Sequence, residues 1–285
     1  MKRKIRSIFY SAAAILFTTT VHAQTDSTAK EKTKPQLKLS LNYNSNLNYY
    51  GRTDSLKSNG VFPMAEFWIN PEFYINAAPI FVNNDLQKMD YAGTVTTIGY
   101  QHMTEKWLTN LYLLKPFYKQ GSQLVQSALK AQSGLSLTKL NKTLNFTLGG
   151  DIKFSDKVDF GATAGIDHII RIENKNNSVL VFDPAFTAYA GTQQFSRTYT
   201  QKKSNSLPLP GTPQQQQTVT EQVKQFNVLA YELSVPVIYV KGKWQLLATP
   251  SYIIPQNLLT VPNRPDLSEH GSNTFYITTG IKYTL

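Results

Sequence analysis

The sequence predicts an all-β protein: a transmembrane, antiparallel, up-and-down β-barrel of about 12 strands, with about 10 or about 14 strands as the alternatives. Three observations predict this fold. Long segments alternate apolar and polar residues, which gives each strand one face for lipid and one for water. After residue 23, no segment is as long and apolar as a membrane-spanning helix. Long and short connections also alternate along the chain, as they do at the two ends of a membrane barrel.

The N-terminal segment has the three parts of a secretory signal peptide. Basic side chains lie within residues 2–6, an apolar run covers residues 8–17, and small residues precede Gln24. The apolar run is shorter than the ~20 residues of a helical span, which disfavours the alternative of an N-terminal anchor. We expect Sec-type export, cleavage of residues 1–23 near Ala23, a disordered periplasmic leader over 24–36, and a barrel over 37–285.

The composition excludes several classes of site. The chain has 285 residues, of which 41% are hydrophobic and 16% charged, and this suits one large β domain. It contains no cysteine, which removes disulfides, thiolate metal sites, a cysteine nucleophile and a lipid-modified cysteine. The formal net charge is +11, and the first 23 residues hold four basic and no acidic side chains, so +7 remains. We expect contact with outer-membrane lipid and lipopolysaccharide phosphates, and the predicted location excludes nucleic acid.

The alternation defines the strands in chain order. In the first strand, residues 37–49, leucine and tyrosine occupy odd positions while lysine, serine and asparagine occupy even ones. The other predicted strands are 61–69, 72–82, 92–102, 106–118, 124–138, 143–153, 157–171, 178–200, 224–240, 244–255 and 274–285. Because proline lacks the N–H that a β-ladder needs, five prolines predict bulges or strand ends: Pro79, Pro116, Pro184, Pro236 and Pro250.

The connections divide into two sets if the N-terminus is periplasmic. The predicted outside set is 51–60, 83–91, 119–123, 154–156, 201–223 and 256–273. The predicted periplasmic set is 70–71, 103–105, 139–142, 172–177 and 241–242. Most long connections therefore fall outside. A secreted β-sandwich, the soluble alternative, has no reason to segregate its loops in this way.

In each strand, the charged residues on the face opposite to the lipid-facing one are predicted to point into the lumen. They are Lys38, Glu66, Glu72, Lys130, Asp151, Lys153, Asp159, Asp167, Arg171, Asp183, Glu232 and Lys282. One interpretation is a polar pore whose charges orient a solute. The alternative is a set of mutually neutralising ion pairs that fills a narrow barrel.

Aromatic side chains are predicted to form girdles at the two membrane interfaces, where an amphipathic ring is most stable. The candidates are Tyr43, Tyr49, Trp68, Trp107, Phe117, Tyr231, Tyr239, Trp244, Tyr252 and Tyr283.

Catalytic and metal-binding patterns are sparse. His168 follows Asp167, which suggests acid–base chemistry, but the alternation sends Asp167 inward and His168 outward. The sequence contains no phosphate-binding glycine loop, no HExxH pattern and no EF-hand ladder. We therefore predict no enzyme activity, no cofactor and no metal site.

The last predicted strand reads TFYITTGIKYTL. It has a polar residue, a glycine two positions on and hydrophobic residues at its end, namely Thr278, Gly280, Tyr283 and Leu285. This pattern resembles the C-terminal targeting strand of bacterial outer-membrane β-barrels, with leucine in place of the commoner terminal phenylalanine. The resemblance implies that the strand closes the barrel and is read by the barrel-assembly machinery.

The whole chain after residue 23 resembles the outer-membrane barrels of Bacteroidota. The resemblance rests on the rhythm of strands and loops and on the segments YELSVPVIYVKGKW, LATPSYIIPQN and FYITTGIKYTL. It implies the outer membrane of a Gram-negative bacterium and a porin-like or small-solute channel of unknown substrate. The alternative is a non-conducting structural or surface-interaction barrel that uses loops 201–223 and 256–273. The His/Ser site of the twelve-stranded outer-membrane phospholipases has no recognisable signature here.

Overall fold

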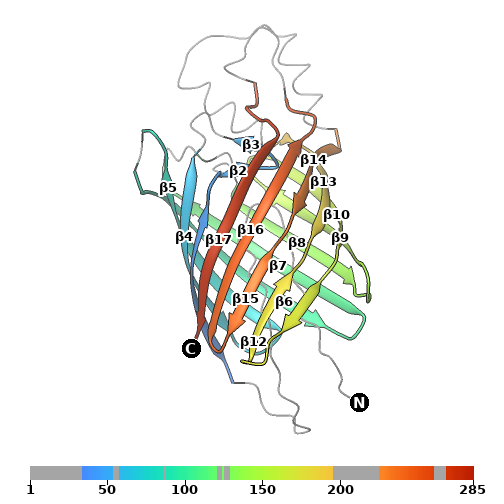
Figure 1. The fold of residues 1–285 in the computed structure, drawn as a ribbon. Helices are drawn as coiled ribbons and strands as arrows, with labels where there is room; N and C mark the ends of the chain where they lie inside the picture. The colour runs from blue at the N-terminus through green and yellow to red at the C-terminus, as the bar shows by residue number, and fades with distance from the viewer. Residues whose placement is uncertain are drawn as a thin grey trace, which may run out of the picture.

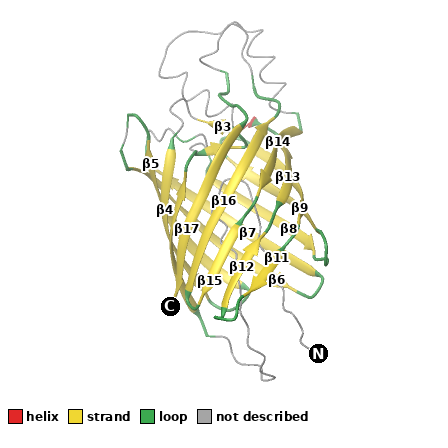
Figure 2. Cartoon of the chain, viewed as in Figure 1, coloured by secondary structure: helices red, strands yellow, loops and turns green. Residues whose placement is uncertain are grey.

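The computed structural model describes residues 34–53, 58–86, 88–120, 124, 129–194, 225–259 and 268–285. Over these residues the chain forms a closed antiparallel barrel of 12 wall strands, which confirms the predicted fold class and strand number (Figures 1 and 2). Among the same residues, no helix is long enough and apolar enough to cross a membrane.

The wall is closed by pairing between its first and last strands. β17 pairs with β16 on one side and with β1 on the other. Three wall strands are each built from two segments, namely β10 with β11, β12 with β13, and β14 with β15. The wall segments are β1 (Gln36–Asn44), β4 (Asn59–Trp68), β5 (Phe73–Asn83), β6 (Asp90–Met103), β7 (Trp107–Tyr118), β8 (Ala131–Lys139), β9 (Asn145–Phe154), β10 (Val158–Asp167), β11 (Ile170–Glu173), β12 (Ser178–Phe182), β13 (Ala185–Gly191), β14 (Asn227–Ser234), β15 (Val237–Lys241), β16 (Trp244–Pro255) and β17 (Thr274–Thr284). A separate hairpin is formed by β2 (Asn48–Tyr49) and β3 (Arg52–Thr53).

The gaps inside the two-segment strands lie side by side in the sheet. Pro184 and Pro236 occupy two of them, and their carbonyls accept hydrogen bonds from the amides of His168 and Asp183 at 3.1 Å and 3.0 Å. Because proline has no N–H, it ends the ladder locally while its carbonyl still joins the neighbouring strand. Pro79 lies beside the register shift at Ile80/Phe81. Pro116 and Pro250 are paired inside strands, so the prediction of a bulge or strand end is wrong for these two.

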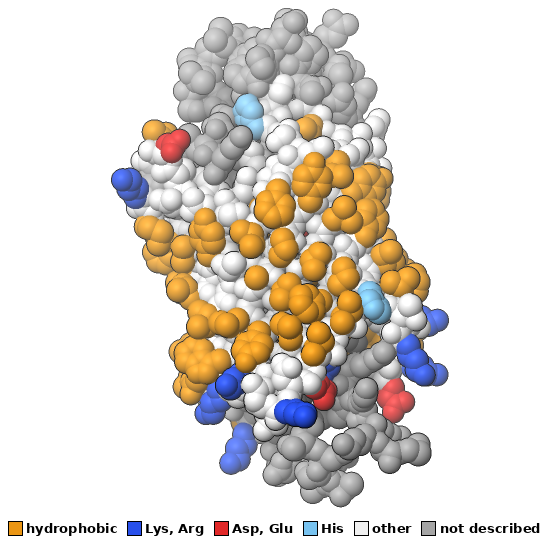
Figure 3. Space-filling model, in the orientation of Figure 1, with side chains coloured by type: hydrophobic (Ala, Val, Ile, Leu, Met, Phe, Trp, Pro, Cys, Tyr) orange, Lys and Arg blue, Asp and Glu red, His pale blue; other side chains and the backbone are white. Residues whose placement is uncertain are grey.

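The wall has an apolar outer face and a polar inner face. In β1, Leu41 is 50% exposed while Asn42 is 3% exposed, and in β17 Phe275 is 64% exposed while Lys282 is 6% exposed. Apolar side chains cover the middle of the face shown in Figure 3. A water-soluble protein buries most of its large apolar side chains, so the polarity of this barrel is inverted.

The connections at the two ends of the barrel differ in length. We call the end that carries the C-terminus the inner end (Figure 1). Its connections are 69–72, 104–106, 140–144, 174–177 and 242–243. The connections at the opposite, outer end are 45–58, 84–89, 119–130, 155–157, 192–226 and 256–273. Apart from 155–157, every outer connection is longer than every inner one, as predicted for most of the long connections. The predicted loop 201–223 lies outside the described residues.

Some predicted strand ends are wrong. The first strand ends at Asn44 instead of continuing to residue 49, because the chain turns there towards the β2–β3 hairpin. The strand predicted to start at 124 starts at Ala131, and the strand predicted to reach 200 ends at Gly191. Residues 1–33 lie outside the described part of the chain, so the signal peptide and leader stay predictions.

Two of the predicted interface aromatics are inside the barrel. Trp68 is 3% exposed and shares the inner face of β4 with Met64 and Glu66. Tyr49 lies in the hairpin and packs against the buried cluster that contains Phe62. Both assignments to the membrane interface are wrong, because aromatic character alone does not determine whether a side chain faces the lipid or the interior. Other candidates do lie on the outer face, with exposed fractions of 41% for Trp107, 53% for Phe117, 51% for Trp244 and 39% for Tyr252.

Candidate functional site

The first outer connection folds into the mouth of the barrel. Its β2–β3 hairpin turns at Tyr50 and Gly51, which have φ angles of 54° and 75°. Two successive residues with positive φ give the tight turn that a short hairpin favours. A Cβ atom on Gly51 would lie only 2.9 Å from Cδ of Pro255, so glycine also permits close packing against β16.

Arg52 fixes the hairpin to the barrel. Its Nε donates to Oε2 of Glu269 at 3.0 Å, and the pair is almost fully buried. Its Nη1 donates to the carbonyls of Tyr50 and Leu229 at 3.1 Å, and its Nη2 donates to the carbonyl of Gln256 at 3.0 Å. One guanidinium therefore joins the hairpin, β14 and two points of the last outer connection, Gln256 and Glu269. Because these donors are satisfied, burial of the charge is tolerated.

Tyrosine rings hold the hairpin against the opposite wall. The Tyr50 ring centroid lies 4.4 Å from that of Tyr49 and 5.0 Å from that of Tyr189 on β13. Tyr50 also belongs to a buried cluster with Ile253 and Tyr276. Burial raises the pKa of the Tyr49 and Tyr50 phenols above its ordinary value.

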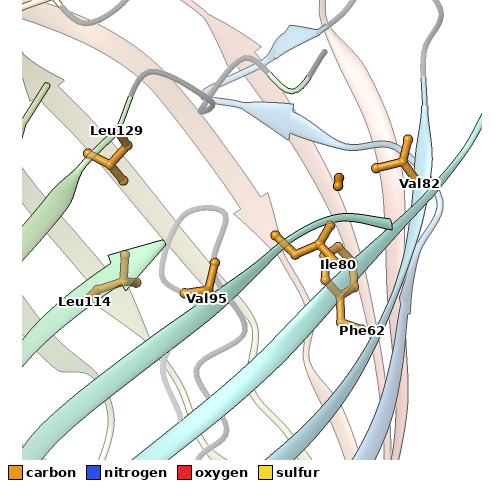
Figure 4. Packing of buried hydrophobic residues seen from close by; sticks show 7 residues of the cluster. Phe62, Ile80, Val82, Val95, Leu114 and Leu129 are labelled. Carbon is orange, nitrogen blue, oxygen red and sulfur yellow. The ribbon is translucent and has the colours of Figure 1, made fainter. Parts of the chain in front are cut away.

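An apolar cluster fills another part of the outer half of the interior. Its buried members come from the inner faces of β4 to β7 and from Leu129, and six of them are labelled in Figure 4. They are Phe62, Ile80, Val82, Ala92, Val95, Leu114 and Leu129. Leu47 and Tyr49, which flank or belong to the hairpin, pack against this cluster. The hairpin is thus the link between two packed regions in the outer mouth.

Lysines and a glutamate form a buried cluster near the inner end. Glu66 on β4 accepts hydrogen bonds from Nε1 of Trp68 at 2.8 Å and from Nζ of Lys282 at 3.5 Å. Nζ of Lys38 lies 4.6 Å from the centroid of the Trp68 ring, which is within the range of a cation–π contact. Lys38, Glu66 and Lys282 are 4%, 1% and 6% exposed. The cluster therefore places two lysine side chains around one carboxylate.

Glu232 is held by tyrosine hydroxyls rather than by a cation. Tyr276 donates to its Oε1 at 2.7 Å and Tyr189 donates to its Oε2 at 3.0 Å. Each carboxylate oxygen thus has a partner from a different wall strand.

A third group of charges lies under the hairpin. Nζ of Lys153 donates to Oδ1 of Asp151, and it lies 5.8 Å from the Tyr50 ring centroid. Asp159 accepts hydrogen bonds from the Thr192 hydroxyl and from the amide of Gln194 at 2.8 Å. Asp159 therefore positions the start of the long outer connection rather than facing an open passage.

Asp167 and Arg171 have partners from the inner half of the wall. Nδ2 of Asn145 donates to Oδ2 of Asp167 at 2.6 Å, and Nε of Arg171 donates to Oε1 of Glu173 at 3.0 Å. His168 does not pair with Asp167 through a hydrogen bond, because its Nδ1 contacts the carbonyl of Thr143 instead. The geometry gives this sequence pair no acid–base arrangement.

Two predicted lumen charges are on the surface. The side chain of Glu72 is 40% exposed and bonds to Nδ1 of His102 at 2.6 Å. The side chain of Lys130 is 64% exposed and pairs with Asp156 at 2.8 Å. Both residues precede their strands, at 73 and 131, so the alternation of the strand does not apply to them. Their assignment to the lumen is wrong.

The four residues of the resemblance to a targeting strand lie along the seam. Thr278 accepts a hydrogen bond from Nδ2 of Asn44 at 3.1 Å, and the amide of Leu285 donates to the carbonyl of Leu37 at 2.9 Å. A Cβ on Gly280 would lie 2.4 Å from Oδ1 of Asn42, so glycine leaves room for that amide. Tyr283 packs against Trp244 with ring centroids 4.7 Å apart.

Arg52 and Glu269, which fix the hairpin to the barrel, are absent from the sequence-based candidates. Arg52 and Glu269 belong to connections that were assigned to the outside, and strands as short as β2 and β3 show no measurable period. The sequence signal that could have found them is Tyr50-Gly51 flanked by Asn48, a typical turn pattern. Within the described residues there is no group of three or more His, Cys, Asp or Glu that could hold a metal ion.

No protein-family model and no curated protein sequence matches the chain. Several solved structures are similar in shape. A structure described as KdgM porin matches with a TM-score of 0.47 and 8% identity, covering 86% of this chain and 98% of that one. A NanC porin structure matches with a TM-score of 0.44 and 12% identity, covering 87% and 100%. The structure of LpxR from Salmonella typhimurium matches with a TM-score of 0.41 and 7% identity, covering 86% of this chain and 99% of that one. At these scores and identities, no function transfers to this chain.

Proposed function

We propose that this chain spans the outer membrane of a Gram-negative bacterium as a porin-like channel for small polar solutes, with the β2–β3 hairpin closing its outer mouth. The inverted polarity of the wall carries this proposal. Leucines and aromatic side chains face outwards over the middle of the barrel, and lysine, glutamate and aspartate side chains face inwards. An apolar exterior is stable against lipid, and a closed barrel satisfies its backbone hydrogen bonds within the bilayer.

Several expectations from the sequence belong to the same proposal. They are cleavage of the signal peptide near Ala23, recognition of the last strand by the assembly machinery, contact with lipopolysaccharide, and a kinship with the barrels of Bacteroidota. The proposal includes no enzyme activity and no cofactor. The first test is migration of the detergent-extracted protein on a gel before and after boiling. A folded membrane barrel migrates differently in the two samples, whereas a soluble β-sandwich shows a single position.

The role of the hairpin is tested by conductance in planar bilayers. Arg52→Ala removes four hydrogen bonds, three of which join the hairpin to the rest of the barrel, and should raise the open probability of the channel. Lys119→Ala, which removes an exposed ion pair at the same end, is the control and should conduct like the wild type. A variant in which 48–53 is replaced by a short glycine–serine linker should give the largest currents.

The packed outer mouth also favours a second candidate, a non-conducting barrel with a structural or surface-interaction role. Both the apolar cluster and the tyrosine cluster occupy space that a permanently open pore needs for water. The two candidates give opposite results with the linker variant. If that variant is folded by the boiling test and still carries no current, the channel is excluded and the non-conducting barrel is supported.

A further inference from the structure

Lysines on the outer face of the barrel alternate with aromatic rings at the inner end. Lys139 at the end of β8 is paired with Trp107 of β7 on one side and with Phe146 of β9 on the other. All three side chains are exposed, and Leu137 and Leu135 continue the same outward row towards the middle of the wall. A lysine in this place has an apolar stem beside two rings and its ammonium group at the edge of the apolar belt.

The same arrangement recurs on the far side of the seam. Lys241 of β15 is paired with Trp244 of β16, which is paired in turn with Tyr283 of β17. Nζ of Lys243, in the turn between β15 and β16, lies 5.8 Å from the centroid of the Tyr283 ring. Lys241, Lys243 and Trp244 are all exposed. Two separate sectors of the inner rim therefore carry lysine next to tryptophan and a second ring.

The lysines compared at the two rims have different partners, although Lys115 in the outer half of β7 also lies 5.5 Å from the centroid of the Phe117 ring. At the outer end, Lys119 pairs with Asp90 at 3.0 Å and Lys130 pairs with Asp156 at 2.8 Å. Among the described residues, no salt bridge joins Lys139, Lys241 or Lys243 to a carboxylate. The acidic side chains of the inner rim are placed elsewhere: Glu72 bonds to His102, Glu173 bonds to Arg171, and Glu105 lies in the turn before β7.

We propose that these two lysine–aromatic rows, Trp107/Lys139/Phe146 and Lys241/Trp244/Tyr283 with Lys243, bind the phosphate groups of anionic phospholipids in the inner leaflet. Tryptophan and tyrosine rings settle at the level of the headgroups, which sets the depth of the adjacent lysines. The ammonium groups then meet lipid phosphate, and each lysine near an anionic membrane surface strengthens the attraction about fivefold. The inference rests on the proposed membrane position, since a soluble barrel would leave both rows in water.

The test compares lipids that share acyl chains and differ in headgroup. The folded protein in detergent is mixed with equal amounts of phosphatidylglycerol and phosphatidylcholine, and the lipids retained by each molecule are counted by native mass spectrometry. The wild type should retain phosphatidylglycerol over phosphatidylcholine by at least about tenfold. The triple variant Lys139→Gln, Lys241→Gln, Lys243→Gln should lose that preference, and the corresponding triple substitution to arginine should keep it.

Lys157 is an exposed lysine of the outer connection 155–157. The variant Lys119→Gln, Lys130→Gln, Lys157→Gln at the outer rim is the control and should retain the preference of the wild type. Equal retention of the two lipids by the wild type, or equal losses in the inner-rim and outer-rim variants, would overturn the inference. Preferential retention of lipid A through the same three lysines would overturn it as well. Boiling-dependent migration is measured for every variant. A wild type without that shift counts against the membrane barrel itself, whereas a normal shift without lipid preference counts against the inference alone.

Discussion

The inner face of β4 passes through two different environments. Towards the outer end, Phe62 packs in an apolar cluster with Ile80 and Val82 from β5. Four residues further along the same face, Glu66 lies between a lysine from β17 and the indole of Trp68. The comparison shows that the alternation of a strand decides which side chains point inwards but not what they meet there. The interior combines a packed plug near the outer mouth with a paired charge cluster near the inner end.

The largest effect is expected when the charge cluster loses its carboxylate. Glu66→Ala leaves Lys38 and Lys282 buried around a missing anion and should lower the free energy of unfolding by about 3–5 kcal/mol. The free energy of unfolding is measured by reversible urea unfolding in lipid vesicles, followed by tryptophan fluorescence. Exposed Glu105→Ala is the control and should stay within about 0.5 kcal/mol of the wild type. A similar result for both variants would contradict the role given to this cluster.

The apolar cluster should respond to loss of volume rather than of charge. Leu114→Ala removes a side chain that is 0% exposed and should cost about 2–5 kcal/mol by creating a cavity. The neighbouring Leu113 is 53% exposed on the outer face, where lipid chains refill the space. Leu113→Ala in the same unfolding assay should therefore cost less than half as much. Equal costs would show that the outer half of the interior is not tightly packed.

A smaller effect is expected at the turn of the hairpin. Gly51→Ala forces a Cβ into a residue with φ of 75° and brings it to 2.9 Å from Pro255, so it should cost about 1–3 kcal/mol. Gly242→Ala is a matched control, because Gly242 has φ of 58° but no atom within 4 Å of the added Cβ. The difference between the two variants in urea unfolding isolates the contact with β16. No difference would mean that the hairpin does not press against that strand.

The smallest effect is expected at the outer rim. Lys119→Ala removes an ion pair whose side chains are 52% and 38% exposed, and water screens such pairs strongly. We expect a change of at most about 1 kcal/mol, which should shrink further in high salt. A larger loss would imply that the outer rim depends on its charges in the way that the inner cluster does.

The faces of the wall could be predicted from the sequence because each strand has a period of two. Lys38 in β1 and Lys282 in β17 alternate with leucine, isoleucine or tyrosine, so the sequence indicates that both lysines face the lumen. The same rule places Trp68 on the inner face of β4 with Glu66. Its assignment to the membrane interface is wrong because it followed the aromatic character of the side chain and not its position in the alternation. Glu72 and Lys130 were misplaced because they lie just before their strands begin.

The hairpin could not be predicted by the same reasoning. β2 and β3 are short, and whether a connection turns inwards depends on partners that are distant in sequence. Arg52 needs Glu269 and the carbonyls of Leu229 and Gln256, which lie 177 to 217 residues away along the chain. A single sequence contains no local pattern for such a contact.

Site-directed spin labelling of β1 tests the central claim most directly. The chain has no cysteine, so single cysteines at residues 39, 40, 41 and 42 give labels without background. In reconstituted vesicles, labels at 39 and 41 should be accessible to oxygen dissolved in lipid, and labels at 40 and 42 should not. Equal accessibility at all four positions, or stronger contact of 39 and 41 with a water-soluble relaxation agent, would contradict a barrel with lipid outside and polar groups within.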